Sequence, residues 1–325
     1  MTIDAQLLKI LRNKTHGVSG AELAQQLGIS RAAVSARIED LRSLGYDIEA
    51  GPHTGYCLVS APDALYADDL ISRLGKTKII GRDIRVFQET DSTNDIVEKL
   101  ARDGLKEGIV VFAESQTKGR GRLGRKWTSP PKKGLWFSLL LRPELRTTEI
   151  TQLTVASAIA IRRAIEKQTG LQPEIKWPND LLIAGKKTAG ILTELYAELD
   201  QVKHIILGIG IDVNLACNDF PTELRSLATS LKIETGKAVS RAELAVHVLR
   251  ELDHVYDRLC SGQFPAIADE WERHCTTIGQ NVIIRTGDRR LRGRAESLDD
   301  HGSLLLRTEH GHLERIIGGD VTLER

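Results

Sequence analysis

The sequence lacks an excess charge of either sign, an apolar run of membrane length and any repeated or low-complexity segment. Its 45 Lys and Arg residues nearly balance its 44 Asp and Glu residues, which leaves a formal net charge of +1. This balance gives no global electrostatic argument for a nucleic acid or a membrane as partner. The longest apolar runs, LWFSLLL and IILGIGI, are far too short to span a bilayer, and the first residues lack a cleavable signal pattern. We therefore expect a cytoplasmic protein with no membrane partner.

Cysteine is scarce and is not arranged in pairs. The four cysteines, Cys57, Cys217, Cys260 and Cys275, have no C-x-x-C spacing, which argues against a zinc site and against a disulfide scaffold. Such a pattern fits a reducing compartment. The length of 325 residues is enough for two or three domains, each with its own core.

Residues 1–60 have the pattern of a winged helix-turn-helix. Three leucines between positions 7 and 11 mark one helix, the segment SGAELAQQLG marks a second helix that Gly28 ends, and Ser30 caps a third. The next segment, YDIEAGPHTGYCLV, alternates apolar residues around a Gly-Pro turn, as the two strands of a hairpin do. In this fold the second helix of the motif lies in the major groove of DNA.

The start of the third helix favours DNA binding, whereas the charge of this region does not. The residues expected at the groove are small or polar, with one arginine suited to phosphate or guanine: Ser30, Arg31, Ala32 and Ser35. However, residues 1–60 hold six Lys or Arg and six Asp or Glu, without the usual basic footprint. A helical interaction domain that never touches DNA therefore stays open beside a domain that binds double-stranded DNA.

The rest of the chain predicts two further domains. After SAPDALYADD, which has the composition of a linker, strand-like runs such as GIVVFAES and HIILGIGIDVNL alternate with helical runs in an α+β pattern. Another helix begins at Ser240, where Glu243 completes a capping box, and from Gly279 onward short alternating strands predict a small β-barrel. The expected domains are residues 1–62, 63–275 and 276–325.

One stretch, ESQTKGRGRLGRKWTSPP, contains a G-x-G-x-x-G at Gly119, Gly121 and Gly124. A Rossmann fingerprint needs a strand before these glycines and a helix after them. The strand is present, but the Pro-Pro pair at the end of the stretch prevents a helix. A Walker P-loop fails as well, because Gly75-Lys76-Thr77 has no glycine at the required upstream position.

Arginines are interleaved with these glycines, at Arg120, Arg122 and Arg125. A flexible linker has no need of them. Glycines allow a backbone to approach a ligand closely, and guanidinium groups supply forked donors to a carboxylate or a phosphate. We therefore expect a disordered loop that closes over an anion. Trp127, just beyond the loop, either stacks on a base or anchors the loop in the core.

A second segment, KWPNDLLIAGKKTAGILTEL, places Lys176, Asn179 and Asp180 around a proline-fixed turn, with Lys187 after a tight AGKK hairpin. Ammonium groups suit phosphate oxygens, and carboxylate or amide oxygens suit Mg²⁺, so the segment fits a nucleotide site. The plain alternative is a turn capped by Asn-Asp beside solvated lysines. The neighbouring arginine loop favours the nucleotide site.

A third segment, ETDSTNDIVEKL, sets Ser92, Thr93 and Asn94 in front of a helix. An N-cap explains one of the three side chains. Three adjacent polar side chains also suit a small polar ligand such as a ureido group, which presents one acceptor and two donors.

The segments DSTN, ESQTKGRGRLGRKW, KWPNDLLIAGKKTAGILTEL and LGIGIDVN resemble, in order and spacing, the motifs of biotin protein ligases. With the helix-turn-helix in front and GSLLLRTEHGHLERIIGGDVTL at the end, the chain resembles the bifunctional members, which are ligase and biotin operon repressor at once. The resemblance covers essentially the whole chain. It implies an α+β multidomain fold: a winged helix-turn-helix, a central α/β catalytic domain of the biotin/lipoate ligase type and an SH3-like β-barrel.

The resemblance also implies a two-step reaction. The biotin carboxylate attacks the α-phosphate of Mg·ATP to give biotinyl-AMP and pyrophosphate, and a lysine of the biotin carboxyl carrier protein of acetyl-CoA carboxylase then attacks the mixed anhydride. Mg²⁺ is the implied cofactor. The adenylate is the implied corepressor of a homodimer that binds double-stranded operator DNA.

Roles carry over only where positions match. The implied biotin-binding residues are Ser92, Thr93, Asn94, Gln116, Gly119, Arg120, Arg122 and Lys187. The implied ATP- and adenylate-binding residues are Arg122, Arg125, Trp127, Lys176, Asn179, Asp180 and Asp212, with Asp180 as the metal ligand. The implied catalytic residues are Lys187, Arg122 and Arg120, and Lys187 is the one that bonds the reacting carboxylate and phosphate.

One position departs from the family. Members commonly have Asn near the adenine, in GIGINVN, where this sequence has Asp212 in GIGIDVN. Asn both donates and accepts hydrogen bonds, whereas a carboxylate only accepts. Asp212 therefore either meets the adenine or faces the metal.

Two rival functions stay open. One is a transcription factor that binds biotin or its adenylate without useful ligation. The other is a lipoate or octanoate ligase, whose catalytic domain has a related fold. The arginine-glycine loop and the DSTN segment argue against the second rival.

Overall fold

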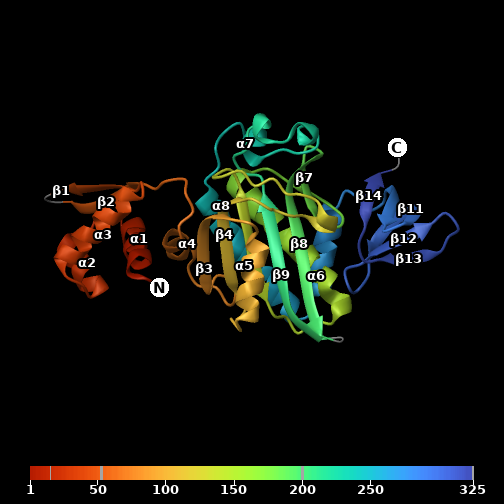
Figure 1. The fold of residues 1–325 in the computed structure, drawn as a ribbon, viewed down its shortest axis with the longest axis horizontal. Coiled ribbons are helices and arrows are strands. Elements are labelled where there is room, and N and C mark those ends of the chain that lie inside the picture. The colour runs from red at the N-terminus through yellow and green to blue at the C-terminus, as the bar shows by residue number, and fades with distance from the viewer. Residues whose placement is uncertain (15, 52–53, 199–200, 324–325) are drawn as a thin grey trace. The chain divides into compact units, whose positions relative to one another are not determined.

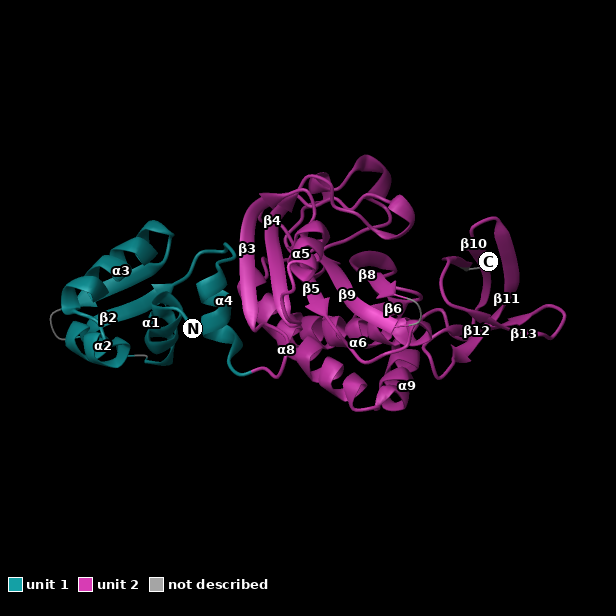
Figure 2. Ribbon diagram, turned by 60° about the horizontal axis from the view of Figure 1, so that its bottom comes forward, with its two compact units in different colours: residues 1–76 teal, residues 77–325 magenta. Residues whose placement is uncertain are grey.

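The computed structural model describes residues 1–14, 16–51, 54–198 and 201–323. The chain forms two compact units, residues 1–76 and residues 77–325 (Figure 2). Within the described ranges, no helix is both long enough and apolar enough to cross a bilayer.

The first unit is a winged helix-turn-helix, as predicted. Its elements are α1 (Ile3–Asn13), α2 (Gly20–Leu27), α3 (Arg31–Ser43), β1 (Asp47–Gly51) and β2 (Gly55–Ser60), the last two paired as an antiparallel hairpin. Ser30 caps α3 by accepting a hydrogen bond from the amide of Ala33 at 3.1 Å, and Gly28 ends α2 with a φ of 67°. The Gly-Pro turn expected in the hairpin includes Pro52, which lies outside the described residues.

A fourth helix, α4 (Ala67–Leu74), also belongs to this unit and packs on α1. It begins inside the segment expected to be a linker. Asp69 is only 2% exposed, and it forms ion pairs with Arg12 of α1 and with Arg73. The compact unit therefore extends to residue 76 instead of ending at the expected boundary after residue 62, because a buried ion-pair network ties this polar helix to α1.

The second unit is built on a seven-stranded mixed sheet (Figure 1). The strand order is β3-β4-β5-β9-β8-β7-β6, in which β3 and β4 are parallel and the other neighbours are antiparallel. The strands are β3 (Asp83–Thr90), β4 (Ile109–Gln116), β5 (Leu135–Leu141), β6 (Glu174–Lys176), β7 (Asp180–Ile183), β8 (Lys186–Glu198) and β9 (Gln201–Ile211). The predicted AGKK hairpin joins β7 to β8, with positive φ at Ala184 and Gly185.

Helices cover both faces of this sheet. On one face α5 (Thr93–Arg102) packs against β4, β5 and β9. On the other face α6 (Ile150–Thr169) packs against β8, and α8 (Arg241–Cys260) and α9 (Phe264–His274) pack on α6 (Figure 1). Successive side chains of β8 show the two faces, since Glu194 bonds Asn94 of α5 and Thr193 bonds Thr154 of α6. Helix α6 therefore covers one face of the sheet. The opposite face, on which α5 packs, carries Asn94 and its partner Glu194.

The C-terminal part forms a five-stranded antiparallel sheet in the order β13-β12-β11-β10-β14, in agreement with the expected small β domain. Its strands are β10 (Asn281–Thr286), β11 (Arg289–Leu298), β12 (Leu304–Thr308), β13 (Leu313–Ile316) and β14 (Asp320–Leu323). The remaining short elements are η1 (Arg122–Gly124), η2 (Thr147–Glu149), η3 (Cys217–Asp219), η4 (Thr222–Leu224) and α7 (Leu231–Thr235). Cys57, Cys217, Cys260 and Cys275 are free thiols.

Candidate functional site

A cavity of about 760 Å³ in the second unit collects most of the residues that the sequence singles out. Its lining includes Ser92, Thr93, Asn94, Gln116, Arg120, Arg122, Arg125, Trp127, Lys176, Asn179, Asp180, Lys187 and Asp212. Gly119 is not part of the lining, but its carbonyl accepts a hydrogen bond from the amide of Trp127 at 2.8 Å. Segments more than 100 residues apart in sequence therefore meet at one site.

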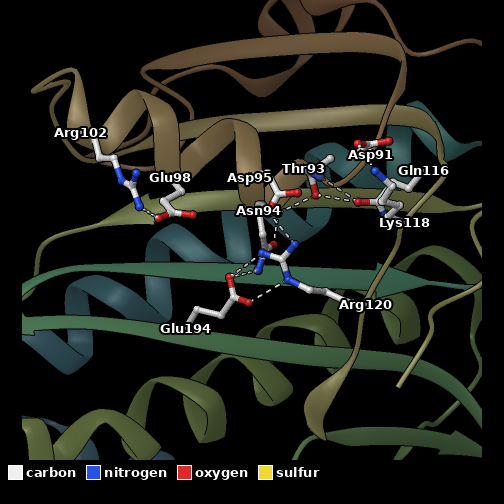
Figure 3. Close-up of polar contacts among 11 residues, drawn as sticks. Asp91, Thr93, Asn94, Asp95, Glu98, Arg102, Gln116, Lys118, Arg120 and Glu194 are labelled. Carbon is white, nitrogen blue, oxygen red and sulfur yellow. Dashed lines mark hydrogen bonds and ion pairs between the residues drawn. The ribbon is translucent and has the colours of Figure 1, made fainter. Parts of the chain in front are cut away.

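The polar end of the cavity lies at the start of α5 (Figure 3). Ser92 occupies the N-cap position without a side-chain cap bond, so the simple capping interpretation is wrong. The amide of Thr93 donates to Gln116 Oε1 at 2.9 Å, and the Thr93 hydroxyl lies 2.6 Å from Ser138 Oγ. Ser92, Thr93 and Asn94 are at most 4% exposed. These contacts hold a buried recess of polar groups in place before any ligand enters.

Arg120 is held by two carboxylates beside this recess (Figure 3). Glu194 accepts from Arg120 Nε at 3.0 Å and also from Asn94 Nδ2 at 2.8 Å, and Asp95 accepts from Arg120 Nη1 at 2.6 Å. The bond to Glu194 is the main cause that raises the pKa of the Arg120 guanidinium, against the lowering effect of burial. Because its side chain is committed to Glu194 and Asp95, Arg120 anchors the root of the glycine-arginine loop.

The glycine-arginine loop folds back on itself as a short hairpin, in which Arg120 and Lys126 form an isolated antiparallel bridge on either side of η1. Gly121 N donates to the carbonyl of Arg125 at 2.7 Å, and Arg125 N donates to the carbonyl of Arg122 at 3.2 Å. The tip turn needs positive φ at two positions, 55° at Leu123 and 73° at Gly124. The backbone of the loop therefore pairs its own polar groups. No helix follows the glycines, as the prolines predicted.

The two arginines at the tip reach different elements. Arg122 Nη1 donates to Asn179 Oδ1 at 3.1 Å, while Arg125 forms an ion pair with Asp320 of β14. Burial lowers the pKa of the Arg122 guanidinium, although it stays charged at any physiological pH. The tip therefore bridges the seven-stranded sheet and the C-terminal sheet across the cavity.

Trp127 lies over two glycines of the sheet. A Cβ placed on Gly190 would come within 2.8 Å of its ring, and one placed on Gly210 within 2.5 Å. The ring also meets Trp136 edge-on, with centroids 6.2 Å apart, and it lines the cavity. The two roles considered for this residue are thus compatible: one edge packs in the core while part of the ring faces the ligand space.

Lys187 stands at the centre of the cationic part of the cavity. Its Nζ lies 2.6 Å from Asp180 Oδ1 and 5.1 Å from the centroid of Trp127. Lys176 and Asp180 face each other across β6 and β7, and the Asn179 side chain donates from Nδ2 to the carbonyl of Ile191 at 2.7 Å. With Arg285 and Arg290 also in the lining, this part of the cavity has an excess of positive charge that suits a polyanion.

Several residues that shape the site were not found from the sequence. Glu194 and Ser138 were not singled out, and their role as supports of Asn94 appears only through contacts with residues far away in the chain. The apolar wall formed by Phe220, Leu224, Leu227 and Ala228 follows no recognisable pattern either. The alternating glycines of LGIGID are a usable signal, because they lie on one face of a strand and leave room for large groups above it.

The DNA-binding candidates lie in the first unit. The Ser30 hydroxyl caps α3 by accepting a hydrogen bond from the amide of Ala33, and this contact does not use its own O–H donor. Arg31, Ala32 and Ser35 are exposed on α3. The exposed side chains are therefore available to a partner of that helix.

Three family models match successive parts of the chain. Residues 4–57 match the HTH domain, residues 86–212 match the biotin/lipoate A/B protein ligase family, and residues 277–323 match the biotin protein ligase C terminal domain. These regions coincide with the winged helix, the catalytic sheet with its cavity, and the C-terminal sheet.

Curated relatives match over nearly their whole length. The chain is 41% identical to the bifunctional ligase/repressor BirA of Bacillus subtilis over 94% of both chains. It is 31% identical to the bifunctional ligase/repressor BirA of Escherichia coli, over 99% of this chain and 97% of that one. A solved biotin protein ligase from Aquifex aeolicus, in complex with biotin and ATP, is 32% identical with a TM-score of 0.64 and covers 75% of this chain and 99% of that chain.

Proposed function

The chain belongs to the family of bifunctional ligase/repressors, and we propose that its cavity joins biotin to ATP and then passes the biotinyl group to a protein lysine. The observation that supports this most strongly is the position of Lys187. It lies beside Asp180 and Trp127, at the centre of the cationic part of a cavity whose other end is a buried polar recess. The two ends of the cavity are only two residues apart on β9, since Asn94 lies over Gly208 and Trp127 over Gly210.

The proposed first step is adenylation. A carboxylate oxygen of biotin attacks the α-phosphorus of ATP, the bond from that phosphorus to the bridging oxygen breaks, and pyrophosphate leaves. Lys187 would form hydrogen bonds to both the carboxylate and the α-phosphate. Negative charge on the phosphoryl oxygens increases in the transition state, so the lysine would stabilise the transition state more than the bound substrates. Arg122 would add a second cation from the loop. Ser92, Thr93, Asn94, Gln116 and the backbone at Gly119 and Arg120 would hold the biotin head.

The proposed second step is transfer to a biotin carboxyl carrier protein. The amine of the carrier lysine attacks the carbonyl carbon of the mixed anhydride, the bond from that carbon to the phosphate oxygen breaks, and AMP leaves. Arg122 and Arg125 would keep the adenylate under the hairpin until the carrier arrives. This activity requires ATP and, for the repressor, chromosomal DNA, so we place the protein in the cytoplasm.

Mg²⁺ fits the site as a companion of the nucleotide. Asp180 Oδ1 is buried and forms no hydrogen bond within the described residues, although it pairs with Lys187. In the same described ranges, no group of three or more His, Cys, Asp or Glu residues is arranged to hold a metal ion. One carboxylate together with substrate phosphates is a usual Mg²⁺ environment. When bound with ATP, Mg²⁺ would neutralise charge on the triphosphate, and Asp180, with Asn179 and Lys176 beside it, would orient that end.

The winged helix supports a second role, repression with biotinyl-AMP as corepressor. We propose that the exposed start of α3 is the part of a recognition helix that enters the groove, and that two chains bind a two-fold symmetric operator as a homodimer. Repression of the operator would then depend on the concentration of biotinyl-AMP, and therefore on the supply of biotin.

Arg31→Ala is expected to weaken operator binding by about tenfold to a hundredfold, because a well-placed arginine contact to guanine or phosphate discriminates at that level. Transfer of biotin should not change. The measurement is fluorescence anisotropy on a genomic fragment selected by the adenylate-loaded protein. Lys9→Ala, which removes one exposed charge from α1, is the control. Equal losses of operator affinity in both variants, or no loss in either, would exclude α3 as the DNA-recognition helix.

The ligase proposal is tested by incubating the protein with radiolabelled biotin, Mg·ATP and a carrier domain. We expect label on the carrier lysine, and we expect excess lipoate not to compete. Absence of label with DNA binding retained would identify a transcription factor that binds biotin without ligation. Competition by lipoate would identify the other rival.

The two glycines of β9 allow the ends of the cavity to be separated by matched substitutions. A Cβ on Gly208 would lie 2.5 Å from Asn94 Oδ1, and a Cβ on Gly210 would lie 2.5 Å from the Trp127 ring. Gly208→Ala is therefore expected to weaken biotin binding by about tenfold and to spare ATP, whereas Gly210→Ala should do the reverse. Calorimetric titration of each ligand into both variants measures this. If either variant loses both ligands equally, the division of the cavity is wrong.

A further inference from the structure

Glu194 of β8 holds two lining side chains of the cavity, although it is not itself part of the lining. Its Oε2 accepts from Asn94 Nδ2 at 2.8 Å and from Arg120 Nη2 at 3.2 Å, while its Oε1 accepts from Arg120 Nε at 3.0 Å (Figure 3). One carboxylate therefore joins a residue of the polar recess to the root of the glycine-arginine loop.

The Glu194 carboxylate fixes which way the Asn94 amide faces. A carboxylate only accepts hydrogen bonds, so the Asn94 atom beside it must be the donor Nδ2 and not the acceptor Oδ1. Oδ1 consequently lies on the other side of the amide, where it accepts from Ser138 Oγ of β5. A Cβ on Gly208 would come within 2.5 Å of Oδ1, so the amide fits closely over β9.

The orientation of the Asn94 amide determines where the hydroxyl protons of the recess lie. Ser138 has a single O–H, and that O–H is donated to Asn94. The Thr93 hydroxyl lies 2.6 Å from Ser138 Oγ, a separation that requires a proton between the two oxygens. Because the Ser138 proton is already used, Thr93 must donate to Ser138. The Thr93 oxygen is then left with lone pairs only.

Gln116 does not offer the Thr93 hydroxyl a better partner. Its Oε1 already accepts from the Thr93 amide at 2.9 Å, and it lies 3.2 Å from the hydroxyl, farther than Ser138 does. Its Nε2 donates to Ser129 Oγ at 2.9 Å, so the Gln116 amide also has a fixed orientation. Since Thr93 lines the cavity, a ligand group that meets its oxygen must be a hydrogen-bond donor.

We propose that Glu194 is a positioning residue that makes the recess selective for a ligand whose head carries an N–H donor. It acts on Thr93 through Asn94 and Ser138. The same carboxylate holds Arg120, so the recess and the root of the glycine-arginine loop share one support. This inference rests on the proposed function, in which a ureido ring with two N–H groups occupies the recess.

Selectivity between biotin and two analogues tests the role of Glu194. In each analogue a ring oxygen replaces one ureido N–H, which gives the two cyclic carbamates; both keep the shape, the carbonyl group and the valerate chain of biotin. Affinities are measured by calorimetric titration without ATP. Wild type is expected to bind biotin about tenfold to a hundredfold more tightly than the carbamate whose ring oxygen meets Thr93, because two acceptors then face each other.

Glu194→Gln is expected to lose about tenfold of that preference. A Gln amide presents a donor as well as an acceptor, so the Asn94 amide can turn over. Ser138 then donates to Thr93, and Thr93 can donate to the ring oxygen of the carbamate. A preference that stays at the wild-type level in Glu194→Gln would overturn the proposal.

Asp95→Asn is the matched control. Asp95 is the other carboxylate that holds Arg120, at 2.6 Å, and within the described residues its side chain forms no hydrogen bond with Asn94 or Thr93. The variant weakens the support of Arg120 and leaves the other hydrogen bonds in place, so it should prefer biotin as strongly as wild type does. Equal losses of preference in Glu194→Gln and Asp95→Asn would assign the effect to Arg120 and contradict the proposal.

Ser138→Ala interrupts the same series of hydrogen bonds at a second position. It removes the acceptor of the Thr93 proton, so Thr93 becomes free to donate although Glu194 is intact. The preference should fall about as far as in Glu194→Gln, and the double variant should lose no more than either single variant, because the two residues act through one network. Losses that add, or equal weakening of all three ligands, would indicate a merely structural role and rule the proposal out.

The titrations also separate this inference from the ligase function. A protein with the expected preferences that transfers no biotin to a carrier would overturn the ligase function and leave the role of Glu194. Wild type that transfers biotin, yet binds both carbamates as tightly as biotin, would overturn the role of Glu194 and leave the ligase function. A protein that binds none of the three ligands would overturn both.

Discussion

Lys187→Ala should slow adenylate formation by about a hundredfold to a thousandfold, while biotin binding changes little. Losses of this size follow when one preorganised charge or donor is removed from a site where charge develops in the transition state. Lys187 lies beside Asp180 and above the Trp127 ring, in the cationic part of the cavity and not among the contacts of Ser92 and Thr93. Its charge is therefore placed for the reacting atoms more than for the biotin head.

The measurement for Lys187 is single-turnover release of pyrophosphate, with biotin affinity determined by calorimetry on the same variant. Lys186→Ala is the matched control, since Lys186 is the exposed neighbour at the start of β8. A biotin affinity that falls as far as the rate would show that Lys187 binds the ground state and has no special role in the transition state.

Arg122→Gly should let the adenylate escape about tenfold to a hundredfold faster, because a charge-assisted contact over the cavity is lost. In the structure Arg122 donates to Asn179 at 3.1 Å and lies beside Gly318, so it ties the hairpin tip to both walls. Escaped biotinyl-AMP reacts with any accessible amine, and label should therefore spread to lysines of bystander proteins.

The control for Arg122 uses the same replacement one residue further along. Leu123→Gly introduces equal flexibility at a position whose φ is already 55° and which glycine adopts without strain, yet it removes no charge. Label is expected to remain on the carrier in Leu123→Gly and to spread in Arg122→Gly. Unchanged selectivity in Arg122→Gly, or equal spreading of label in both variants, would show that the Arg122 guanidinium does not keep the adenylate under the hairpin.

Helices and strands whose ends are set by nearby capping or turn residues were predictable from the sequence. Ser30 and Gly28 delimit the helices of the winged helix through a side-chain cap and a left-handed residue, and both signals act within a few residues. The strands around the cavity follow from apolar runs and tight turns such as AGKK. Most of the residues singled out as site candidates also line one cavity, because they lie on segments whose glycine, proline and polar patterns are local.

The pairings of those residues were not predictable. Asn94 and Glu194 are 100 positions apart, and Arg125 and Asp320 are 195 apart, so no local pattern connects them. Local composition was misleading at Asp69, which looks like linker sequence but is buried by Arg12, 57 positions away. The hairpin form of the loop includes a positive φ at Leu123, a conformation that its side chain disfavours and that the sequence does not signal.

Retention of the adenylate under this hairpin is the central claim, and a single-turnover measurement tests it most directly. The protein is incubated with biotin and Mg·ATP without carrier, passed through a desalting column, and its bound small molecules are identified by mass spectrometry. We predict close to one biotinyl-AMP per chain, discharged onto the carrier lysine with release of AMP when a carrier domain is added. Recovery of biotin and ATP alone, or of an adenylate that leaves the protein before the carrier arrives, would contradict the account.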